Sequence, residues 1–207
     1  CDIVLNELDA LANIDFATRT EKDEHRTLEI VRIGTCGGMQ EDIPLGTFLV
    51  SEKSIGWDGV LAFYEGRDEI ADLGFEDALV KFINYPTKAA RPYVVAADKE
   101  LVDRIAQDDM TRGCTIAANG FYGPQGRVLR CDLAVKDIND RITDFRYEGQ
   151  RITNYEMEGS VIAGLSLLMG HKAMTVCCVI AQRKVEAANT DYKPRIKQLV
   201  QTVLERI

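Results

Sequence analysis

Residues 172–181 are the segment that most restricts the fold of this chain. Between Lys172 and Ala181 almost every side chain is apolar, and a strand of this composition is typical of a sheet that is covered on both faces. A helical pattern at 158–169 precedes it, and a strand pattern at 151–155 precedes that helix. Strand, helix and strand in this order predict an α/β fold, with helices on both faces of a central mixed sheet in a three-layer α/β/α arrangement.

The same alternation continues in the other parts of the chain. Apolar residues at helical spacing predict a first helix that begins at a capping aspartate and is buried along one face. These residues are Asp2 as the cap and Val4, Leu8, Leu11 and Ile14 along the face. The other predicted strands lie at 28–33, 47–55, 92–96 and 115–118, and the other predicted helices at 69–83, 98–105 and 193–207. Because the chain has no linker or internal repeat, residues 1–207 are predicted to form a single domain.

The charge balance limits the partners of this chain. Its 207 residues include 25 lysines and arginines and 33 aspartates and glutamates, a net charge of −8. Nucleic acids and anionic membranes bind a basic face, so we expect neither as a partner. No apolar run approaches the roughly 20 residues that span a bilayer, and the pattern of a secretion signal is not found. An anionic ligand would have to be bound locally, by a few arginines and backbone amides.

Cysteine and histidine usage favours a reduced protein without a metal. The six cysteines contain no CxxC pair and no Cys/His cluster of the kind that holds structural zinc. Cys177 and Cys178 lie in the apolar segment, where buried thiols are expected. We therefore predict a cytoplasmic protein in which His25, in a charged run, and His171, in a turn, are exposed. The chain starts with Cys1 instead of methionine, so we expect that it lacks a natural N-terminal part.

The first candidate site follows the strand at 28–33. Arg32, Gly34 and Thr35 open a segment with further glycines at 37 and 38. Glycines leave backbone N–H groups accessible to an approaching anion, while Arg32 adds a bidentate cationic donor and Thr35 a hydroxyl. This pattern predicts a phosphate site. A tight glycine turn with Arg32 in a structural ion pair would give the same sequence.

The second candidate site is the loop at 119–127, whose glycines and proline exclude a helix or a strand. It presents the ring of Phe121, the amide of Gln125 and the guanidinium of Arg127. A Gln amide both accepts and donates, and Arg donates, so this pair matches the edge of an imide base such as uracil. An aromatic ring can pack against that base. An ordinary surface loop with a packed aromatic residue is the alternative.

The third candidate site is the strand-to-helix transition at 154–160, where Glu156 and Glu158 lie two positions apart. A carboxylate accepts hydrogen bonds from both hydroxyls of a vicinal diol, which suits a sugar. A general acid/base pair and a carboxylate in the first turn of a helix are the alternatives. Gln182 and Arg183 end the apolar strand, at the sheet edge where α/β folds bind ligands. Together these segments describe a phosphate, a diol sugar and an imide base, which make up a nucleoside and inorganic phosphate.

Three segments resemble the signature segments of the uridine phosphorylases, members of the nucleoside phosphorylase superfamily. They are Arg-Ile-Gly-Thr-Cys-Gly-Gly at 32–38, Phe-Tyr-Gly-Pro-Gln-Gly-Arg at 121–127 and Asn-Tyr-Glu-Met-Glu-Gly-Ser at 154–160. The Glu-Met-Glu segment is shared across the superfamily, whereas the Gln-x-Arg loop is more specific to members that cleave pyrimidine nucleosides. The resemblance implies a nucleoside phosphorylase-like fold and reversible phosphorolysis of uridine, with phosphate as co-substrate and no cofactor. Deoxyuridine and thymidine remain open as further substrates.

The resemblance also implies roles for individual residues. The residues implied for phosphate are Arg32, Gly34 and Thr35, those for the base are Cys36, Gly37, Phe121, Gln125, Arg127 and Arg183, and those for ribose are Thr35, Glu156, Met157 and Glu158. The residues implied for catalysis are Arg32, Gln125, Arg127 and Glu158. Purine-cleaving relatives carry an aspartate in the last segment, and its absence from 179–184 favours a pyrimidine substrate.

The chain departs from the family pattern. Thr-Cys-Gly-Gly at 35–38 replaces the usual Thr-Thr-Gly-Ala, and the charged run at 19–27 resembles an insertion. The family's N-terminal region carries a Gly-Asp-Pro-x-Arg phosphate loop, and a His and an Arg that are donated across a dimer interface; none of these is found. We therefore expect part of the phosphate site to be missing. The resemblance implies a homodimer or a trimer of dimers. A purine nucleoside phosphorylase, a hydrolytic nucleosidase and a non-catalytic nucleoside-binding relative remain as alternatives.

Overall fold

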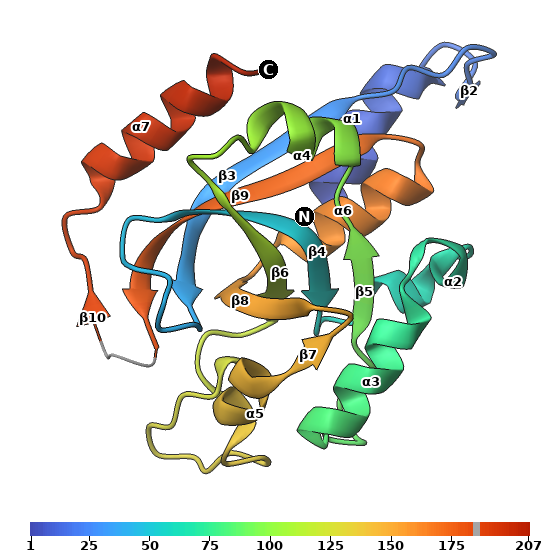
Figure 1. The fold of residues 1–207 in the computed structure, drawn as a ribbon. Helices are drawn as coiled ribbons and strands as arrows, with labels where there is room; N and C mark the ends of the chain where they lie inside the picture. Colours follow the sequence, from blue (N-terminus) through green and yellow to red (C-terminus); the bar gives the residue numbers. More distant parts are fainter. Residues whose placement is uncertain (184–186) are drawn as a thin grey trace.

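A mixed β-sheet forms the centre of the structure, a computed structural model that describes residues 1–183 and 187–207 (Figure 1). Its strands within these ranges are β3 (Glu29–Gly38), β4 (Phe48–Gly56), β5 (Tyr93–Ala96), β6 (Thr111–Ala117), β7 (Arg146–Tyr147), β8 (Gln150–Glu156), β9 (Lys172–Gln182) and β10 (Ala187–Ala188). The strands β3 and β9, β4 and β6, and β6 and β8 run parallel, whereas β3 and β8, β4 and β5, and β4 and β9 run antiparallel. The predicted mixed sheet is therefore confirmed.

The central sheet closes on itself. Strand β4 pairs with β6 along one edge and, through Phe48, Leu49 and Val50, with β9 along the other. As a result β9, β3, β8, β6 and β4 form a ring, which leaves few unpaired strand edges. The register brings the last residues of β3 beside those of β8 and β9, and the end of β6 beside that of β8. Four strands therefore end at one rim.

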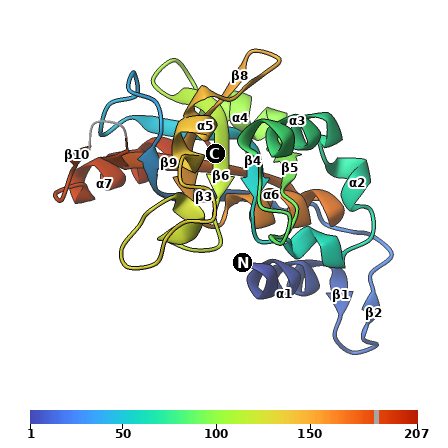
Figure 2. The same cartoon turned by 90° about the horizontal axis from the view of Figure 1, so that it is seen from below.

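Helices cover the sheet from both sides (Figures 1 and 2). They are α1 (Asp2–Asn13), α2 (Arg67–Ile70), α3 (Leu73–Ile83), α4 (Lys99–Ile105), α5 (Ile138–Asp144), α6 (Gly159–Leu168) and α7 (Lys193–Leu204), with short 3-10 turns η1 (Val60–Phe63) and η2 (Gly123–Gln125). Met174, Val176 and Cys178 of β9 pack with residues of α4 and α7. Thr175 lies on the opposite face, against Gly159 of α6. This alternation explains the continuous apolar pattern of β9 and confirms the predicted α/β class.

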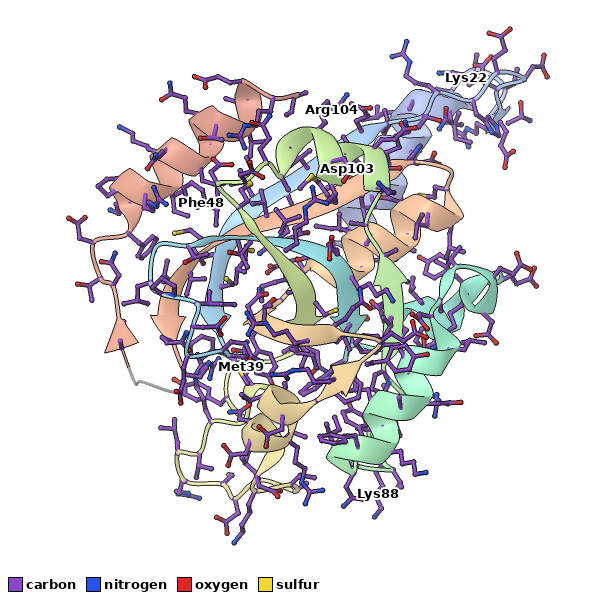
Figure 3. All side chains as sticks on the ribbon, viewed as in Figure 1. Lys22, Met39, Phe48, Lys88, Asp103 and Arg104 are labelled. Carbon is purple, nitrogen blue, oxygen red and sulfur yellow. The ribbon has the colours of Figure 1, made fainter. Side chains whose placement is uncertain are left out.

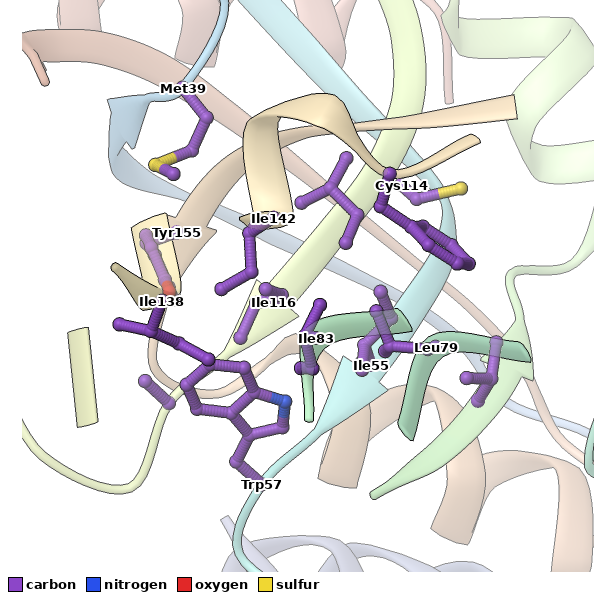
Figure 4. Close-up of a cluster of buried hydrophobic side chains, with 14 of the residues drawn as sticks. Met39, Ile55, Trp57, Leu79, Ile83, Cys114, Ile116, Ile138, Ile142 and Tyr155 are labelled. Carbon is purple, nitrogen blue, oxygen red and sulfur yellow. The ribbon is translucent and has the colours of Figure 1, made fainter. Parts of the chain in front are cut away.

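The largest buried cluster lies between α3, α5 and the closed part of the sheet. Figure 4 shows Ile142 of α5 near Ile116 of β6, with Ile83 of α3 beside them, and all three side chains are fully buried. Trp57 packs edge-on against Tyr155, with ring centroids 5.8 Å apart. Helix α5 was not predicted from the sequence, and it places its first turn beside the loop at 119–127.

The face on which the first helix packs was predicted incorrectly. Leu8 is 41% exposed and Leu11 is 65% exposed, and Val4 also lies on the surface. Instead Leu5 is buried, with Val161 of α6 in the same apolar cluster. The apolar spacing identified a helix, but α1 contacts α6 only through a narrow face that is offset from the predicted one.

Other differences from the predicted elements are local. The predicted helix at 69–83 is interrupted before Asp72, so that α2 and α3 are separate helices. The glycine segment after Ile33 is not a turn: it continues β3 to Gly38, because β9 pairs with it throughout. His171 is buried, not exposed, since its Nδ1 accepts the N–H of Leu28 (3.3 Å) and its Nε2 lies 3.1 Å from an Asp9 oxygen.

The charged run at 19–29 lies on the surface, and His25 within it is exposed, as predicted. It includes the second strand of a hairpin formed by β1 (Ile14–Asp15) and β2 (Thr20–Glu21). Figure 3 shows Lys22 at the end of this hairpin, away from the sheet. Over the two described ranges, no helix is long and apolar enough to cross a membrane.

Asp72 stabilises the start of α3 both as a helix cap and as one partner of an ion pair. We expect a substitution to remove the ion pair and keep the cap. Its Oδ1 accepts the N–H of Phe75 (3.0 Å), and its Oδ2 lies 2.6 Å from Lys53 Nζ. Burial, the largest influence, raises the pKa of Asp72, but the hydrogen bonds from Lys53 and Phe75 outweigh it, so the pKa is lowered. Asp72→Asn keeps the helix cap and loses the ion pair, so the free energy of unfolding should fall by about 1 kcal/mol at pH 7.

The difference in the free energy of unfolding between wild type and Asp72→Asn should shrink as the pH falls. Because the folded state lowers the pKa of Asp72, the contribution of its carboxylate is complete above the unfolded pKa of about 3.9 and is lost as the pH falls through the folded value. Urea unfolding of the wild type and Asp72→Asn between pH 7 and pH 2.5 measures it. Asp108→Asn, at an exposed position, is the control. If the difference in the free energy of unfolding between wild type and Asp72→Asn is as large at pH 2.5 as at pH 7, the assignment is contradicted.

Candidate active site

A cavity of about 240 Å³ lies at the rim where the strands end. Its lining comes from β3, the loop at 119–127, the β8–α6 junction and the end of β9: Arg32, Thr35, Cys36, Gly37, Phe121, Gln125, Arg127, Tyr155, Glu156, Met157, Glu158, Ile180 and Ala181. The three segments singled out in the sequence therefore meet in one place. Of the predicted site residues, only Gly34 and Arg183 do not line this cavity. A larger cavity of about 510 Å³ contains none of the predicted residues. Its lining is Trp57, Tyr85, Pro86, Lys88, Ala89, Ala90, Asn119, Gly123, Pro124, Asp132, Leu133, Ala134, Val135 and Ile138.

Gly34 and Arg183, the two predicted residues outside the lining, each contact a residue that lines the cavity. A Cβ atom at Gly34 would lie 2.8 Å from Arg32 Nη1, so Gly34 allows the guanidinium of Arg32 to fold over the strand. A Cβ atom at Gly37 would lie 3.2 Å from Arg183 Nε, so Arg183 packs against the floor of the cavity. The glycines of β3 thus serve close packing of two arginines within a strand.

Arg32 is surrounded by acceptors in this structure. Its Nη1 lies 3.1 Å from Glu156 Oε2 and 3.1 Å from Cys177 Sγ, and its Nη2 pairs with Glu158 Oε2. Burial alone would lower the pKa of Arg32, but Cys177 and the two carboxylates outweigh it and raise the pKa. The guanidinium charge is therefore balanced by protein groups.

The two carboxylates beside Arg32 differ in their environment. Glu156 is 3% exposed, and its oxygens accept the N–H groups of Glu158 (3.0 Å) and Gly159 (2.9 and 3.0 Å) at the start of α6. Burial is the main cause that raises the pKa of Glu156. The Glu158 side chain is 41% exposed. Glu156 is thus held by the protein, whereas the carboxylate of Glu158 is accessible from the cavity.

The opposite side of the cavity is cationic. The amide oxygen of Gln125 accepts hydrogen bonds from Arg127 Nη1 (2.8 Å) and from Arg183 Nη2. The Arg127 guanidinium also lies 3.7 Å from the centroid of the Phe121 ring. Burial, followed by repulsion from Arg127, lowers the pKa of Arg183 to about 10. Two cations held this close together favour a ligand that carries or develops negative charge.

Several residues of the site had no role in the sequence analysis. Tyr155 lies in a segment that was singled out, and it forms a buried wall whose ring is 5.3 Å from the Arg183 guanidinium. Its aromatic character at the end of a strand was the available signal. Cys177 was read as core, and its contact with Arg32 depends on the pairing of β3 with β9, which its apolar surroundings do not indicate.

No group of three or more His, Cys, Asp or Glu side chains within residues 1–183 and 187–207 is placed to hold a metal ion.

Comparison with known proteins gives matches over most of the chain. A family model described as the phosphorylase superfamily matches residues 12–206. Uridine phosphorylase A of Schistosoma mansoni is 29% identical over 156 residues, which are 74% of this chain and 47% of that protein. Uridine phosphorylase of Thermococcus kodakarensis is 24% identical over 155 residues, 74% of this chain and 48% of that protein. The chain thus spans about half the length of these curated relatives.

A solved structure with a similar fold is that of a Trypanosoma brucei nucleoside phosphorylase, described as showing uridine phosphorylase activity. The TM-score is 0.82 at 24% sequence identity, and the match covers 99% of this chain and 75% of that one. Uridine phosphorylase of Schistosoma mansoni in its ligand-free form matches with a TM-score of 0.64 at 24% identity, over 98% of this chain and 65% of that one. At these identities the structural matches establish the fold.

Proposed function

Because this chain belongs to the phosphorylase superfamily, we propose that it catalyses the reversible phosphorolysis of uridine to uracil and ribose 1-phosphate in nucleoside salvage. The observation that supports this reaction most is the placement of Gln125 and Arg127, with Arg183 bonded to Gln125, on one side of a cavity that also holds Arg32 and Glu158. The first group suits a pyrimidine that leaves as an anion, and the second suits ribose and phosphate. The reaction uses inorganic phosphate as co-substrate and needs no cofactor.

The base site stabilises the leaving group in this proposal. As the glycosidic bond breaks, positive charge develops on the ribose and negative charge spreads over the uracil ring and its carbonyl oxygens. Gln125, Arg127 and Arg183 direct donors at that charge, and donors that are held in place before the reaction lower the barrier most effectively. Phe121 packs against the ring, while Cys36 and Gly37 form the floor.

The ribose and phosphate sites share Arg32. The accessible carboxylate of Glu158 accepts the vicinal hydroxyls of ribose, beside Glu156, Met157 and Thr35. When Glu158 turns to the sugar, Nη2 of Arg32 loses its partner and becomes available to phosphate. Arg32, the Thr35 hydroxyl and the backbone at Gly34 then hold phosphate beneath the anomeric carbon, which provides proximity. Binding of ribose thereby prepares the site for the anion.

We further propose that the enzyme works in the cytoplasm as a homodimer or a trimer of dimers. Part of the phosphate site is then provided by groups other than those of the described cavity, because Glu156 still balances Arg32 after Glu158 has turned to the sugar.

Release of free base from uridine, thymidine and inosine, with and without phosphate, tests the proposal. We expect uracil release from uridine that requires phosphate and yields ribose 1-phosphate. Equal release without phosphate would indicate a hydrolytic nucleosidase, and preferential cleavage of inosine a purine nucleoside phosphorylase. Calorimetric binding of uridine without turnover at any phosphate concentration would indicate a nucleoside-binding relative.

A further inference from the structure

The loop that carries the base-site residues has little regular structure of its own. Between β6 and α5, residues 118–137 contain only the 3-10 turn η2, although this segment supplies Phe121, Gln125 and Arg127 to the cavity. Its backbone is bonded to the sheet at Ala118, whose N–H donates to the carbonyl of Glu156 (2.9 Å). A loop with so few ladder hydrogen bonds depends on side-chain contacts to keep a fixed position. The question is which contact holds this one.

Asn139, in the first turn of α5, contacts both the loop and the wall of the cavity. Its Nδ2 donates to the carbonyl oxygens of Gln125 (3.2 Å) and Gly126 (3.4 Å). Its Oδ1 accepts the hydroxyl of Tyr155 (3.2 Å). One amide therefore ties the backbone of the base-reading residue to the buried ring at the end of β8.

The backbone of the loop has a conformation that allows this contact. Gly126 has a φ of +68°, a conformation that favours glycine. A Cβ atom at that position would lie 2.4 Å from Asn139 Nδ2, so the loop can approach the amide only without a side chain there. Tyr155 in turn lies below the Arg183 guanidinium, whose Nη2 donates to Gln125. The contacts of Asn139 with the loop and with Tyr155, called the tether below, therefore connect to the donors on the base side of the cavity.

We propose that Asn139 is a positioning residue, which sets Gln125 and Arg127 at the correct place for the base without touching the substrate. It lies outside the residues that line the cavity. An amide is suited to this place because it donates to two carbonyls with one end and accepts a hydroxyl with the other. The inference rests on the proposed function in so far as the base is the ligand of this side of the cavity.

Kinetics of substituted enzymes test the proposal. Asn139→Ala should lower kcat/KM for uridine about tenfold, mainly through a higher KM for uridine, with the KM for phosphate within about twofold of wild type. Asn139→Asp should behave alike, because a carboxylate faces the two carbonyls without a donor. Tyr155→Phe removes only the other end of the tether, so its effect and that of Asn139→Ala should not multiply in the double variant.

Thr143→Val is the matched control on the same helix. Thr143 lies one turn further along α5, and its hydroxyl donates to the carbonyls of Asn139 (2.8 Å) and Met39 (3.4 Å), not to the loop. Its kcat/KM should stay within about twofold of wild type. The proposal is overturned if Asn139→Ala keeps the wild-type KM for uridine, or if the KM values for uridine and phosphate rise in equal proportion.

Hydrogen–deuterium exchange separates this proposal from the proposed function. Amides at 121–127 should exchange faster in Asn139→Ala than in wild type, while those of β8 keep their protection. This readout needs no turnover. If the protein does not cleave uridine and exchange at 121–127 still rises, the tether stands and the assigned reaction fails. Unchanged exchange in that loop rejects the tether, whatever the activity.

Discussion

Replacing Arg127 by alanine is expected to lower kcat/KM for uridine about 100-fold, while the free energy of unfolding changes by less than about 1 kcal/mol. The guanidinium donates to Gln125 and lies over the Phe121 ring, at the side of the cavity where the uracil anion forms. Loss of one donor that acts on developing charge typically costs about 3 kcal/mol of transition-state stabilisation. Its contacts are within a surface loop, so the folded core is left intact.

Steady-state kinetics and urea unfolding of the same preparation measure both parts of this expectation. Arg130→Ala is the control, since Arg130 is an exposed arginine three positions further along the same loop. It should leave both quantities near wild type. Near-normal turnover in Arg127→Ala would remove the basis for a base site at this loop.

Replacing Arg32 by alanine should destabilise the protein by about 3 kcal/mol or more, in addition to abolishing most turnover. Glu156 is 3% exposed and pairs with Arg32 at 3.1 Å. Without the guanidinium its carboxylate would remain buried beside Glu158 with no cation. Removal of one partner of a buried ion pair leaves an uncompensated charge, which costs far more than the pair itself contributes.

The destabilisation should depend on pH with a defined sign. Burial already raises the pKa of Glu156 in the folded protein, and loss of Arg32 removes an opposing influence. A carboxyl whose folded pKa lies above its unfolded value of roughly 4.3 holds its proton more tightly in the folded state. Its contribution to stability therefore falls as the pH rises through this interval, so the deficit of Arg32→Ala should be larger at pH 7 than at pH 4.

Arg104→Ala provides the comparison for Arg32→Ala. Arg104 pairs with Glu29 at 2.5 Å, but both side chains are about two-fifths exposed, at 42% and 39%. A pair of this kind contributes about 0–1 kcal/mol. If urea unfolding gives the same small loss for Arg32→Ala as for Arg104→Ala, Arg32 is not the counter-ion of a buried carboxylate.

The main elements could be predicted because their signals are local. The apolar run of β9 and the capping aspartate Asp98 of α4 depend on residues a few positions apart. The cap of α3 at Asp72 was missed, because the predicted helix at 69–83 ran across it. The side chain of Asp98 accepts the N–H of Leu101, as its position before the predicted helix implied. Helix α5 was missed because it is short and follows a long irregular segment.

Contacts between distant residues could not be predicted from such signals. The buried state of His171 depends on Asp9 and Leu28, and the exposed face of α1 depends on where α6 lies. Neither relation leaves a periodic pattern. The same holds for Cys177, whose thiol contacts Arg32 only because β3 pairs with β9.

By itself, the sequence determined the α/β class and the chemical groups at the ends of the strands, because strand composition, glycine content and helix caps act over a few neighbouring residues. The tertiary structure alone decided that those groups meet. Arg32 and Glu158 are 126 positions apart, and Arg183 and Gln125 are 58 apart; they come together because the ring of strands ends at one rim. It also decided that Glu156 is held by the protein and Glu158 is accessible. Burial is a property of the packed fold, and it sets which of two identical side chains can bind a ligand.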